Sequence, residues 1–583
     1  MTKELIPSLS ELLIWPEGQK PWAKQEEGHQ KSSGERLFAL LMEQRTGKTG
    51  VTLGTAAFQY RRFLAAGGFG AAGAATIDLP RLPKFARLSD LPKKPSKPSM
   101  IYRPEAWASK GLDAMIVVAL PSGVPRNWRD EIELRIPPSM SPRTFLWDSK
   151  KADGVAYAEE FRRFVSHMGW AAFLINGEAI PTALARKAIG TFLRTRRALT
   201  VGDETSLICS QPGNVRAKVM DAIKGLPGAI ARRILDGTPC EESILDAFAQ
   251  FSFLDRKILG FDSWTAFKKF YASWEVAEIW VKNPKTGRPE ARNVLKQSVD
   301  EGTSKKVYAN LDVMAKAIAP YSFRVRRADC FDVPDKLYKT HRFELSKAQR
   351  KVYDPLREEF EAELRDGTIV SATHALARMV RLNQVGSNFW PSMKLPMICP
   401  DCGGDGCEVC ADVGALMIAT EKKIIDPVSN PRLDALAEII TANREPGIVW
   451  AVFDETIDAI LALGTKLGLD PVRYDGKVSE EEKAKNKAAF QGGRSGLFVS
   501  KEASGGRGLC LSAAGWHAYV ENTWSRRKRS QSEDRAEVVG RTKGTAIYDV
   551  VADDTYDDIQ LASQLGKLEN AGEFWRQLKG AAS

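Results

Sequence analysis

The 583-residue chain has few long apolar runs and few cysteines. Its longest clean apolar runs, such as residues 114–120, are far shorter than the roughly 20 residues that span a bilayer, and the start MTKELIPSLSELLIWPEG has no signal-type apolar core. Four of the eight cysteines are scattered, which argues against a disulfide framework. No solenoid-length repeat and no base-reading module is apparent. We therefore expect a cytoplasmic protein without a membrane partner.

The overall composition is that of a soluble globular protein, with 43% hydrophobic and 27% charged residues. Its length is too great for one core and suggests about three to four folding units. The net charge of +11 and the pI near 9.1 favour a polyanionic partner such as nucleic acid.

A candidate phosphate-binding loop, EQRTGKT, occupies residues 43–49 after a short apolar run. A GKT sequence that opens a helix can surround phosphate with backbone N–H groups, while Lys48 supplies charge and Thr49 a ligand for Mg²⁺. Met42 stands where GxxxxGK(S/T) has its first glycine, so the match is incomplete. The residues predicted to contact the nucleotide here are Thr46, Gly47, Lys48 and Thr49.

A pair of acids, Asp203 and Glu204, ends the apolar run at residues 198–202. At the end of a strand, one acid can hold Mg²⁺ while its neighbour orients an attacking water, as phosphoryl transfer to water requires. The alternative for the pair alone is a solvated acidic turn.

Strand-like runs followed by helical patterns recur in two sets, and this alternation predicts an α/β fold with two parallel-sheet lobes. We expect the first lobe in residues 1–255, with a flexible insertion at about 65–112 that is rich in Gly and Ala and then in Pro and Lys. A helical connector is expected in residues 256–394, a small insertion in residues 395–415 and the second lobe in residues 416–583.

The insertion carries the sequence CPDCGGDGCEVC, which gives two CxxC knuckles with glycines between them. Four thiolates with tight turns suit one closed tetrahedral Zn²⁺ site, formed by Cys399, Cys402, Cys407 and Cys410. A redox pair and an iron–sulfur cluster are the alternatives.

The order of motifs resembles helicase superfamily 2, and within it the Swi/Snf-type DNA translocases in a compact form like those of bacteriophages. The first lobe contains VVALPSGVPRNWRDEI, INGEAI, DETS, RILDGTP and FAQFSFLD. The second contains YDGKVSEEEKAKNKAAFQ, FVSKEASGGRGLCLSAA and QSEDR. The resemblance implies two RecA-like lobes that hydrolyse ATP with Mg²⁺ in the cleft between them and move along duplex or forked DNA without sequence specificity.

The resemblance also assigns roles to residues. Catalysis falls to Lys48, Asp203, Glu204, Arg535 and Arg541, and nucleotide contacts extend to Gln25 and Gly508, although Gln25 also fits a surface residue in a polar loop. Thr49 and Asp203 would hold Mg²⁺. The residues expected to contact DNA are Ser122, Lys501, Gly505, Gly506, Trp524, Arg526 and Arg527, where the alternative for the basic run is a solvated surface.

Several residues depart from the family pattern. Ser206 replaces the usual His of the acidic motif, so its link to Asp236 is expected to use a hydroxyl. Val538 stands where a second arginine is usual, and Arg541 follows three residues later. The other functions open to the sequence are a non-hydrolysing, ATP-gated nucleic-acid-binding protein and an RNA helicase. Protein partners, polarity and oligomeric state are open.

Overall fold

The structure is a computed structural model of the whole chain. It describes residues 5–69, 87, 89, 110–120, 124–282, 289–300, 306–332, 334–365, 372–390, 394–398, 415–419, 423–502, 509, 511–537 and 543–582. The chain forms two compact units. Unit 1 comprises residues 1–273, 306–333 and 567–583, and unit 2 comprises residues 274–305 and 334–566.

Unit 1 is built on a seven-stranded parallel sheet in the order β3-β4-β2-β5-β6-β1-β9. Its strands are β1 (Leu37–Met42), β2 (Ala114–Ala119), β3 (Arg143–Leu146), β4 (Ala171–Asn176), β5 (Ala198–Asp203), β6 (Ala229–Leu235) and β9 (Ser322–Val325). Most of these strands are continuous apolar runs, such as LFALLM in β1 and AMIVVA in β2, as expected where helices cover both faces of a sheet.

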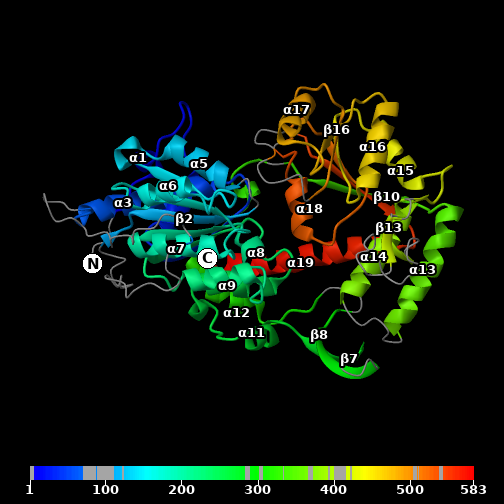
Figure 1. Cartoon of the computed structure of the whole chain (residues 1–583), viewed down its shortest axis with the longest axis horizontal. Helices are drawn as coiled ribbons and strands as arrows, with labels where there is room; N and C mark the ends of the chain where they lie inside the picture. The colour runs from blue at the N-terminus through cyan, green and yellow to red at the C-terminus, as the bar shows by residue number, and fades with distance from the viewer. Residues whose placement is uncertain are drawn as a thin grey trace. The chain divides into compact units, whose positions relative to one another are not determined.

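The helices of unit 1 pack on both faces of its sheet (Figure 1). Side chains of α3 and α5 join one face in a large apolar core, and Phe192 of α7 packs on Phe173 of β4 on the other face. These helices are α1 (Leu9–Leu12), α2 (Ala23–Ser32), α3 (Lys48–Ala65), α5 (Val124–Arg135), α6 (Val155–Val165), α7 (Ala183–Thr195), α8 (Thr205–Ile208), α9 (Val215–Ile223), α10 (Ala247–Leu254), α11 (Trp264–Tyr271) and α12 (Leu311–Ile318).

Unit 2 is built on a six-stranded parallel sheet in the order β10-β19-β18-β15-β17-β16. Its strands are β10 (Leu337–Phe343), β15 (Gly447–Trp450), β16 (Val472–Tyr474), β17 (Leu497–Ser500), β18 (Trp516–Tyr519) and β19 (Ala546–Ala552). Apolar side chains of α15 and α16 cover one face, and Phe490 of α17 packs in the cluster on the other (Figure 1).

The helices of unit 2 are α13 (Lys347–Arg365), α14 (Ala372–Gly386), α15 (Pro431–Ala442), α16 (Asp454–Lys466), α17 (Glu480–Gln491) and α18 (Arg526–Glu533), and α19 (Tyr556–Ala582) starts in unit 2 and ends in unit 1. Three antiparallel pairs complete unit 2: β7 (Trp274–Lys282) with β8 (Pro289–Gln297), β11 (Phe389–Trp390) with β14 (Lys423–Ile424), and β12 (Lys394–Ile398) with β13 (Ala415–Ala419).

The two parallel sheets confirm the predicted α/β fold class. The region predicted as a helical connector differs, because it also contains β7, β8, β9 and β10, and the last two extend the sheets of unit 1 and unit 2. The alternating apolar residues of WEVAEIWVK, which precede a turn-like NPKTG, are a hairpin signal that the helical interpretation overlooked.

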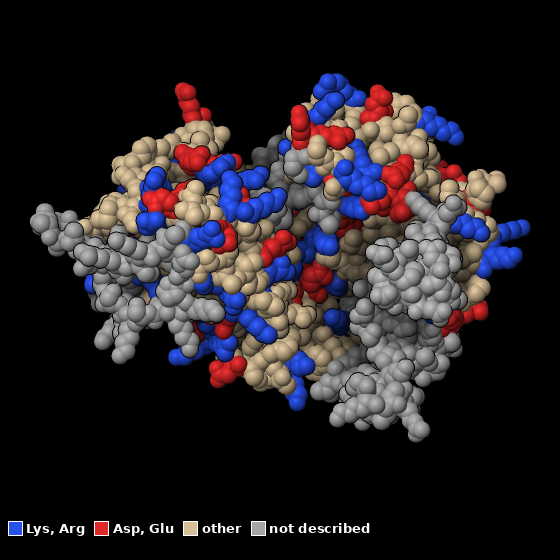
Figure 2. Space-filling model, in the orientation of Figure 1, with Lys and Arg blue, Asp and Glu red and all other residues tan. Residues whose placement is uncertain are grey.

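The predicted insertion at about 65–112 and the cysteine insertion lie almost wholly outside the described residues. No helix in the described part of the chain is long and apolar enough to cross a membrane. On the face drawn in Figure 2, basic side chains are interspersed with acidic ones over each unit.

Candidate nucleotide site

The predicted phosphate loop connects β1 to α3, and α3 begins at Lys48 as predicted. Two residues of the loop have a left-handed backbone, Arg45 at φ 66° and Gly47 at φ 91°. Gly47 is also required for space, because a Cβ atom there would lie 1.8 Å from Nε2 of Gln25. Thr46 is buried and its hydroxyl donates to the carbonyl of Glu43 at 2.7 Å, which closes the turn. The loop therefore curls tightly at the carboxyl end of β1.

Lys48 lies over the loop that precedes it. Its Nζ donates to the carbonyl of Met42 at 2.7 Å. Glu43, the first residue of the loop, does not point at Lys48 but ties the loop to the next strand: its Oε1 accepts from Nη2 of Arg324 at 2.9 Å and its Oε2 from the backbone N–H of Arg327 at 2.9 Å. These contacts of Glu43 fix the loop. The ammonium group of Lys48 therefore stays at the carboxyl edge of the sheet.

Gln25 is 6% exposed and lies against the phosphate loop, so it is not the surface residue of a polar loop that the sequence also allowed. Its Oε1 accepts from the backbone N–H of Trp22 at 2.8 Å at the start of α2. The indole of Trp22 packs edge-on against Phe331 with ring centroids 4.5 Å apart. An amide and an indole thus stand beside the loop, the chemistry that recognition of a nucleobase uses.

These residues line one cavity of about 600 Å³ in unit 1. Besides Gln25, Gly47, Lys48 and Thr49, the lining includes Trp15, Gly18, Gln19, Lys20, Trp22, Glu43, Arg45, Gly50, Glu131 and Arg135. Arg135 stacks on Trp15 at 4.5 Å and pairs with Glu131 at 2.5 Å. Trp15 and Arg135 were not predicted from the sequence, because no motif marks either residue.

The acidic pair sits at the same edge of the sheet as the phosphate loop. β1 and β5 are both parallel to β6, which lies between them, so their carboxyl ends are about 10 Å apart at normal strand spacing. Asp203 and Glu204 are both buried, and Glu204 has a left-handed backbone at φ 55°. Non-glycine residues hold that conformation at a cost and are concentrated at functional sites.

Trp128 of α5 orients the first acid. Its indole Nε1 donates to Oδ2 of Asp203 at 2.9 Å, and both side chains are buried. This contact joins the WRDE helix to the acidic motif and was not predicted from the sequence.

The link between the acidic motif and Asp236 differs from the expected hydroxyl contact. Oδ2 of Asp236 accepts from the backbone N–H of Ser206 at 2.7 Å, and Oδ1 accepts from the backbone N–H of Thr238 at 2.8 Å. A backbone donor makes the link independent of the side chain at position 206.

The remaining predicted site residues that the structure describes lie in unit 2. Arg535 follows α18, is 3% exposed and donates from Nη1 to the carbonyl of Leu509 at 3.4 Å. Lys501 forms an ion pair with Asp454 at 2.7 Å. Trp524 is partly exposed.

Arg526 and Arg527 are buried, in contrast to the solvated surface that the sequence allowed, and Arg526 lies 3.5 Å from Glu533. Their contact with DNA stays a prediction. Ser122, Gly505, Gly506, Gly508, Val538 and Arg541 lie outside the described residues, as do Cys399, Cys402, Cys407 and Cys410. No cluster of metal-ligating side chains occurs among the residues that are described, so the zinc site also stays a prediction.

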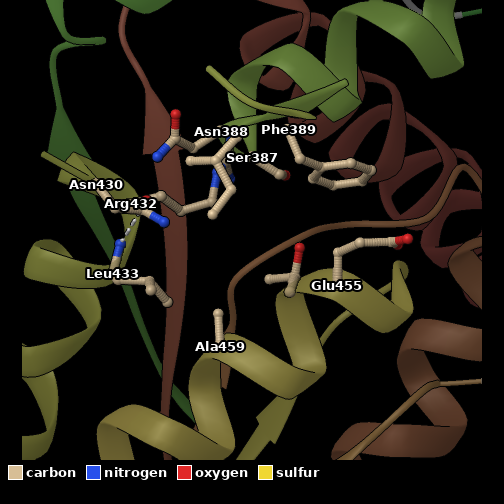
Figure 3. Close-up of a pocket in the computed structure, with 10 residues that line it drawn as sticks. Ser387, Asn388, Phe389, Asn430, Arg432, Leu433, Glu455 and Ala459 are labelled. Atoms are coloured by element: carbon tan, nitrogen blue, oxygen red, sulfur yellow. Dashed lines mark hydrogen bonds between the residues drawn. The ribbon is translucent and has the colours of Figure 1, made fainter. Parts of the chain in front are cut away.

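Unit 2 has a smaller cavity of about 300 Å³ beside β11 and β14 (Figure 3). Two polar side chains of its lining bond to other parts of the protein. Arg432 donates to the carbonyl of Val520 at 2.6 Å and pairs with Asp557 at 2.7 Å. Nδ2 of Asn388 donates to the carbonyl of Asp426 at 2.9 Å. We interpret this cavity as part of the junction that anchors α14, β11 and α15.

The chain is similar in sequence to several curated proteins. It is 22% identical over 492 residues to TATA-binding protein-associated factor BTAF1 of Arabidopsis thaliana, covering 78% of this chain and 22% of that protein. It is 23% identical over 362 residues to "Putative ATP-dependent helicase/translocase YwqA" of Bacillus subtilis, covering 60% and 33%. Lymphoid-specific helicase of Homo sapiens is 29% identical over 114 residues, covering 19% and 14%. The chain thus spans a third or less of the length of these relatives.

No family model matches the chain. Among solved structures, the Sulfolobus solfataricus SWI2/SNF2 ATPase core in complex with double-stranded DNA aligns over 96% of this chain and 95% of that one, at 15% identity and a TM-score of 0.34. A score this low carries no argument about the fold, which rests on the two sheets described above.

Proposed function

We propose a function on the premise that this chain is a relative of the SNF2-family ATP-dependent helicases and translocases, as its motifs predicted and as the similar proteins confirm. The chain hydrolyses ATP when it engages duplex or forked DNA and uses that energy to move along the DNA. The observation that carries this proposal is the placement of the phosphate loop, Gln25 and the Asp203–Glu204 pair in one unit, with the loop and the acids at one edge of a parallel sheet.

The cavity in unit 1 suits a nucleoside triphosphate. Its volume of about 600 Å³ lies within the range of nucleotide-sized pockets. The amino terminus of α3 together with Lys48 and Arg45 offers backbone donors and positive charge to phosphates, while Gln25 and Trp22 offer an amide and an aromatic surface to a base. Thr49 and Asp203 would hold Mg²⁺, which when bound neutralises charge on the phosphates.

The side chains divide the chemistry among themselves. Lys48 attracts the phosphates and stabilises charge that develops on them. Asp203, held by Trp128, presents a carboxylate of fixed orientation, and Glu204 orients and deprotonates the attacking water. Arg535 supplies cationic charge, with Arg541 as the second cation in place of the arginine that Val538 replaces.

DNA is the partner that the basic charge and the relatives favour, and contact is expected through the phosphate backbone rather than through base sequence. A non-hydrolysing, ATP-gated nucleic-acid-binding protein and an RNA helicase are the competing functions. Neither is favoured by the similar proteins, which include ATP-dependent helicases and translocases.

The deciding experiment measures ATP turnover by the purified chain alone, with duplex DNA, with single-stranded DNA and with RNA. We expect the largest stimulation by duplex DNA. Lys48→Ala should lower turnover by about a hundredfold or more, because it removes a cation from the phosphates, and should leave DNA binding largely intact. Lys316→Ala serves as the matched control, since the side chain of Lys316 is 71% exposed on α12 and pairs with the exposed Asp312 at 3.3 Å.

Each competing function gives a different result. Turnover by Lys48→Ala within about twofold of wild type would remove the phosphate loop from the site. ATP binding without turnover would favour the ATP-gated protein, and stimulation by RNA alone would favour the RNA helicase.

A structural zinc site is part of the proposal. The four cysteines of CPDCGGDGCEVC would bind one Zn²⁺ in a closed tetrahedral set that stabilises the insertion. The strands β11 and β14, which pair at either end of this insertion, anchor its ends on unit 2. We also propose a cytoplasmic location, which agrees with the buried thiol of Cys209, a cysteine outside any disulfide.

A further inference from the structure

The chain passes from unit 1 into unit 2 between residues 333 and 334. The residues just after this passage, 334–338, form the crossing segment, which leads into β10. Two of its side chains and two of its backbone groups contact residues on either side of Arg535.

Lys336 reaches the carboxyl end of α18 and contacts acids on both sides of Arg535. Its Nζ lies 3.2 Å from Glu533, 3.0 Å from Asp534 and 3.3 Å from Glu537. The hydroxyl of Tyr338 donates to Oε2 of Glu533 at 2.8 Å. Cations near the carboxyl end of a helix also interact favourably with its dipole.

Beyond Arg535, the backbone of the crossing segment lies against residues 544–545. The N–H of Leu337 donates to the carbonyl of Thr545 at 3.0 Å, and Leu337 then pairs with Ala546 as β10 joins β19. A Cβ atom on Gly544 would lie 2.5 Å from the carbonyl oxygen of Asp335. Only glycine leaves room for this approach.

Glu533 is the centre of the contacts at the end of α18. It is fully buried and also pairs with Nε of Arg529 at 2.9 Å, while Arg529 pairs with Asp549 of β19 at 2.6 Å. The cations Lys336, Arg526 and Arg529 hold the pKa of the Glu533 carboxyl far below its usual range despite burial. A buried charge network of this kind fixes a geometry and is disrupted when one member is removed.

Arg535 is two residues beyond Glu533 and is held by the same turn. Its backbone N–H donates to the carbonyl of Ser532 at 3.2 Å, and its carbonyl accepts from the N–H of Leu511 at 3.0 Å. A shift of the end of α18 therefore shifts Arg535.

We propose that Lys336 is a positioning residue for Arg535: the crossing segment fixes the end of α18 and thereby the position of the arginine that we expect to act on the nucleotide. This inference rests on the proposed ATPase function. It gives the residues 334–338 a role in turnover through Arg535.

The test compares Lys336→Met, Lys336→Arg and Tyr338→Phe for DNA-stimulated ATP turnover. Lys336→Met should lower kcat by about tenfold and change the KM for ATP by less than about twofold, because the cavity of unit 1 is untouched. Lys336→Arg should restore kcat to within about threefold of wild type. Lys339→Met is the matched control, since Lys339 is an exposed lysine of β10, three residues beyond Lys336, that lies over the ring of Tyr548, 5.4 Å from its centroid.

A double variant separates positioning from general destabilisation. If Lys336 acts through Arg535, the variant with both Lys336→Met and Arg535→Ala should be no slower than Arg535→Ala alone. Two substitutions that impair the same catalytic group do not have additive effects. Multiplied losses would overturn the proposal, as would a wild-type kcat in Lys336→Met. Should Lys336→Met fail to fold, Tyr338→Phe carries the test, with an expected kcat about threefold lower and an unchanged melting temperature.

The outcomes distinguish this proposal from the proposed function. Absence of DNA-stimulated turnover in the wild type would overturn both. An active wild type that loses activity in Arg535→Ala but not in Lys336→Met or Tyr338→Phe would overturn only the positioning role.

Discussion

Replacing Trp128 by phenylalanine should weaken catalysis more than it weakens the fold. The indole Nε1 of Trp128 donates to Oδ2 of Asp203 at 2.9 Å inside unit 1, and Asp203 is the acid that we expect to hold Mg²⁺. Phenylalanine keeps the aromatic body in the core beside β2 but removes the donor. The carboxylate then loses the contact that fixes its orientation.

The size of the effect follows from the strength of this hydrogen bond. A buried hydrogen bond to a charged group contributes about 1.5–3 kcal/mol. If about 1.4 kcal/mol of it is needed in the transition state, turnover falls about tenfold. The Mg²⁺ concentration that gives half-maximal turnover should rise several-fold, because a mobile carboxylate binds the ion less well.

Trp147→Phe is the matched control for Trp128→Phe. Trp147 is a buried tryptophan of unit 1 whose Nε1 donates to the neutral hydroxyl of Ser149 at 3.1 Å. Both variants lose a similar ring volume, so their melting temperatures should fall by similar amounts. Steady-state ATP turnover, titrated with Mg²⁺, should separate them. Equal kcat values and equal Mg²⁺ dependence in the two variants would refute the role assigned to the Trp128–Asp203 contact.

Three further predictions concern the proposed chemistry. Glu204→Gln should bind ATP with near-normal affinity in a nucleotide-binding assay but should not hydrolyse it; normal turnover would place the catalytic base elsewhere. Protein purified without chelator should contain one zinc per chain by elemental analysis, and replacing Cys402 and Cys407 with serine should lower the melting temperature more than ATP affinity; iron with sulfide would exclude structural zinc. Arg535→Ala and Arg541→Ala should each slow DNA-stimulated hydrolysis by at least about tenfold, roughly 1.4 kcal/mol, and an effect at Arg535 alone would indicate one cationic residue.

The sequence was sufficient to locate the elements that strong local patterns specify. Continuous apolar runs such as LFALLM predict buried parallel strands, and GKT predicts the helix start at Lys48, which the structure confirms. Parallel strands place their carboxyl ends together, so the phosphate loop and the acidic pair lie at one edge although 155 residues separate Lys48 from Asp203.

The contacts that complete the site could not be predicted, because they join residues without a fixed spacing. Trp128 meets Asp203 across 75 residues, and Lys336 meets Glu533 across 197. The link from Asp236 uses the backbone of Ser206, which no residue type reveals. The hairpin of β7 and β8 was missed for another reason, since a turn-like signal between two β-rich runs was outweighed by the helical pattern around it.

Unit 1 is built from three separate segments of the chain, and their order determines when all of it is available for folding. Its sheet receives β9 from residues 306–333, and residues 567–583 belong to it as well, where Lys567 pairs with Glu242 at 2.8 Å. A ribosome adds about 5–20 residues per second, so the final residues of unit 1 emerge well after the phosphate loop has left the exit tunnel. Nascent unit 1 therefore lacks its final residues until the whole of unit 2 has been synthesised.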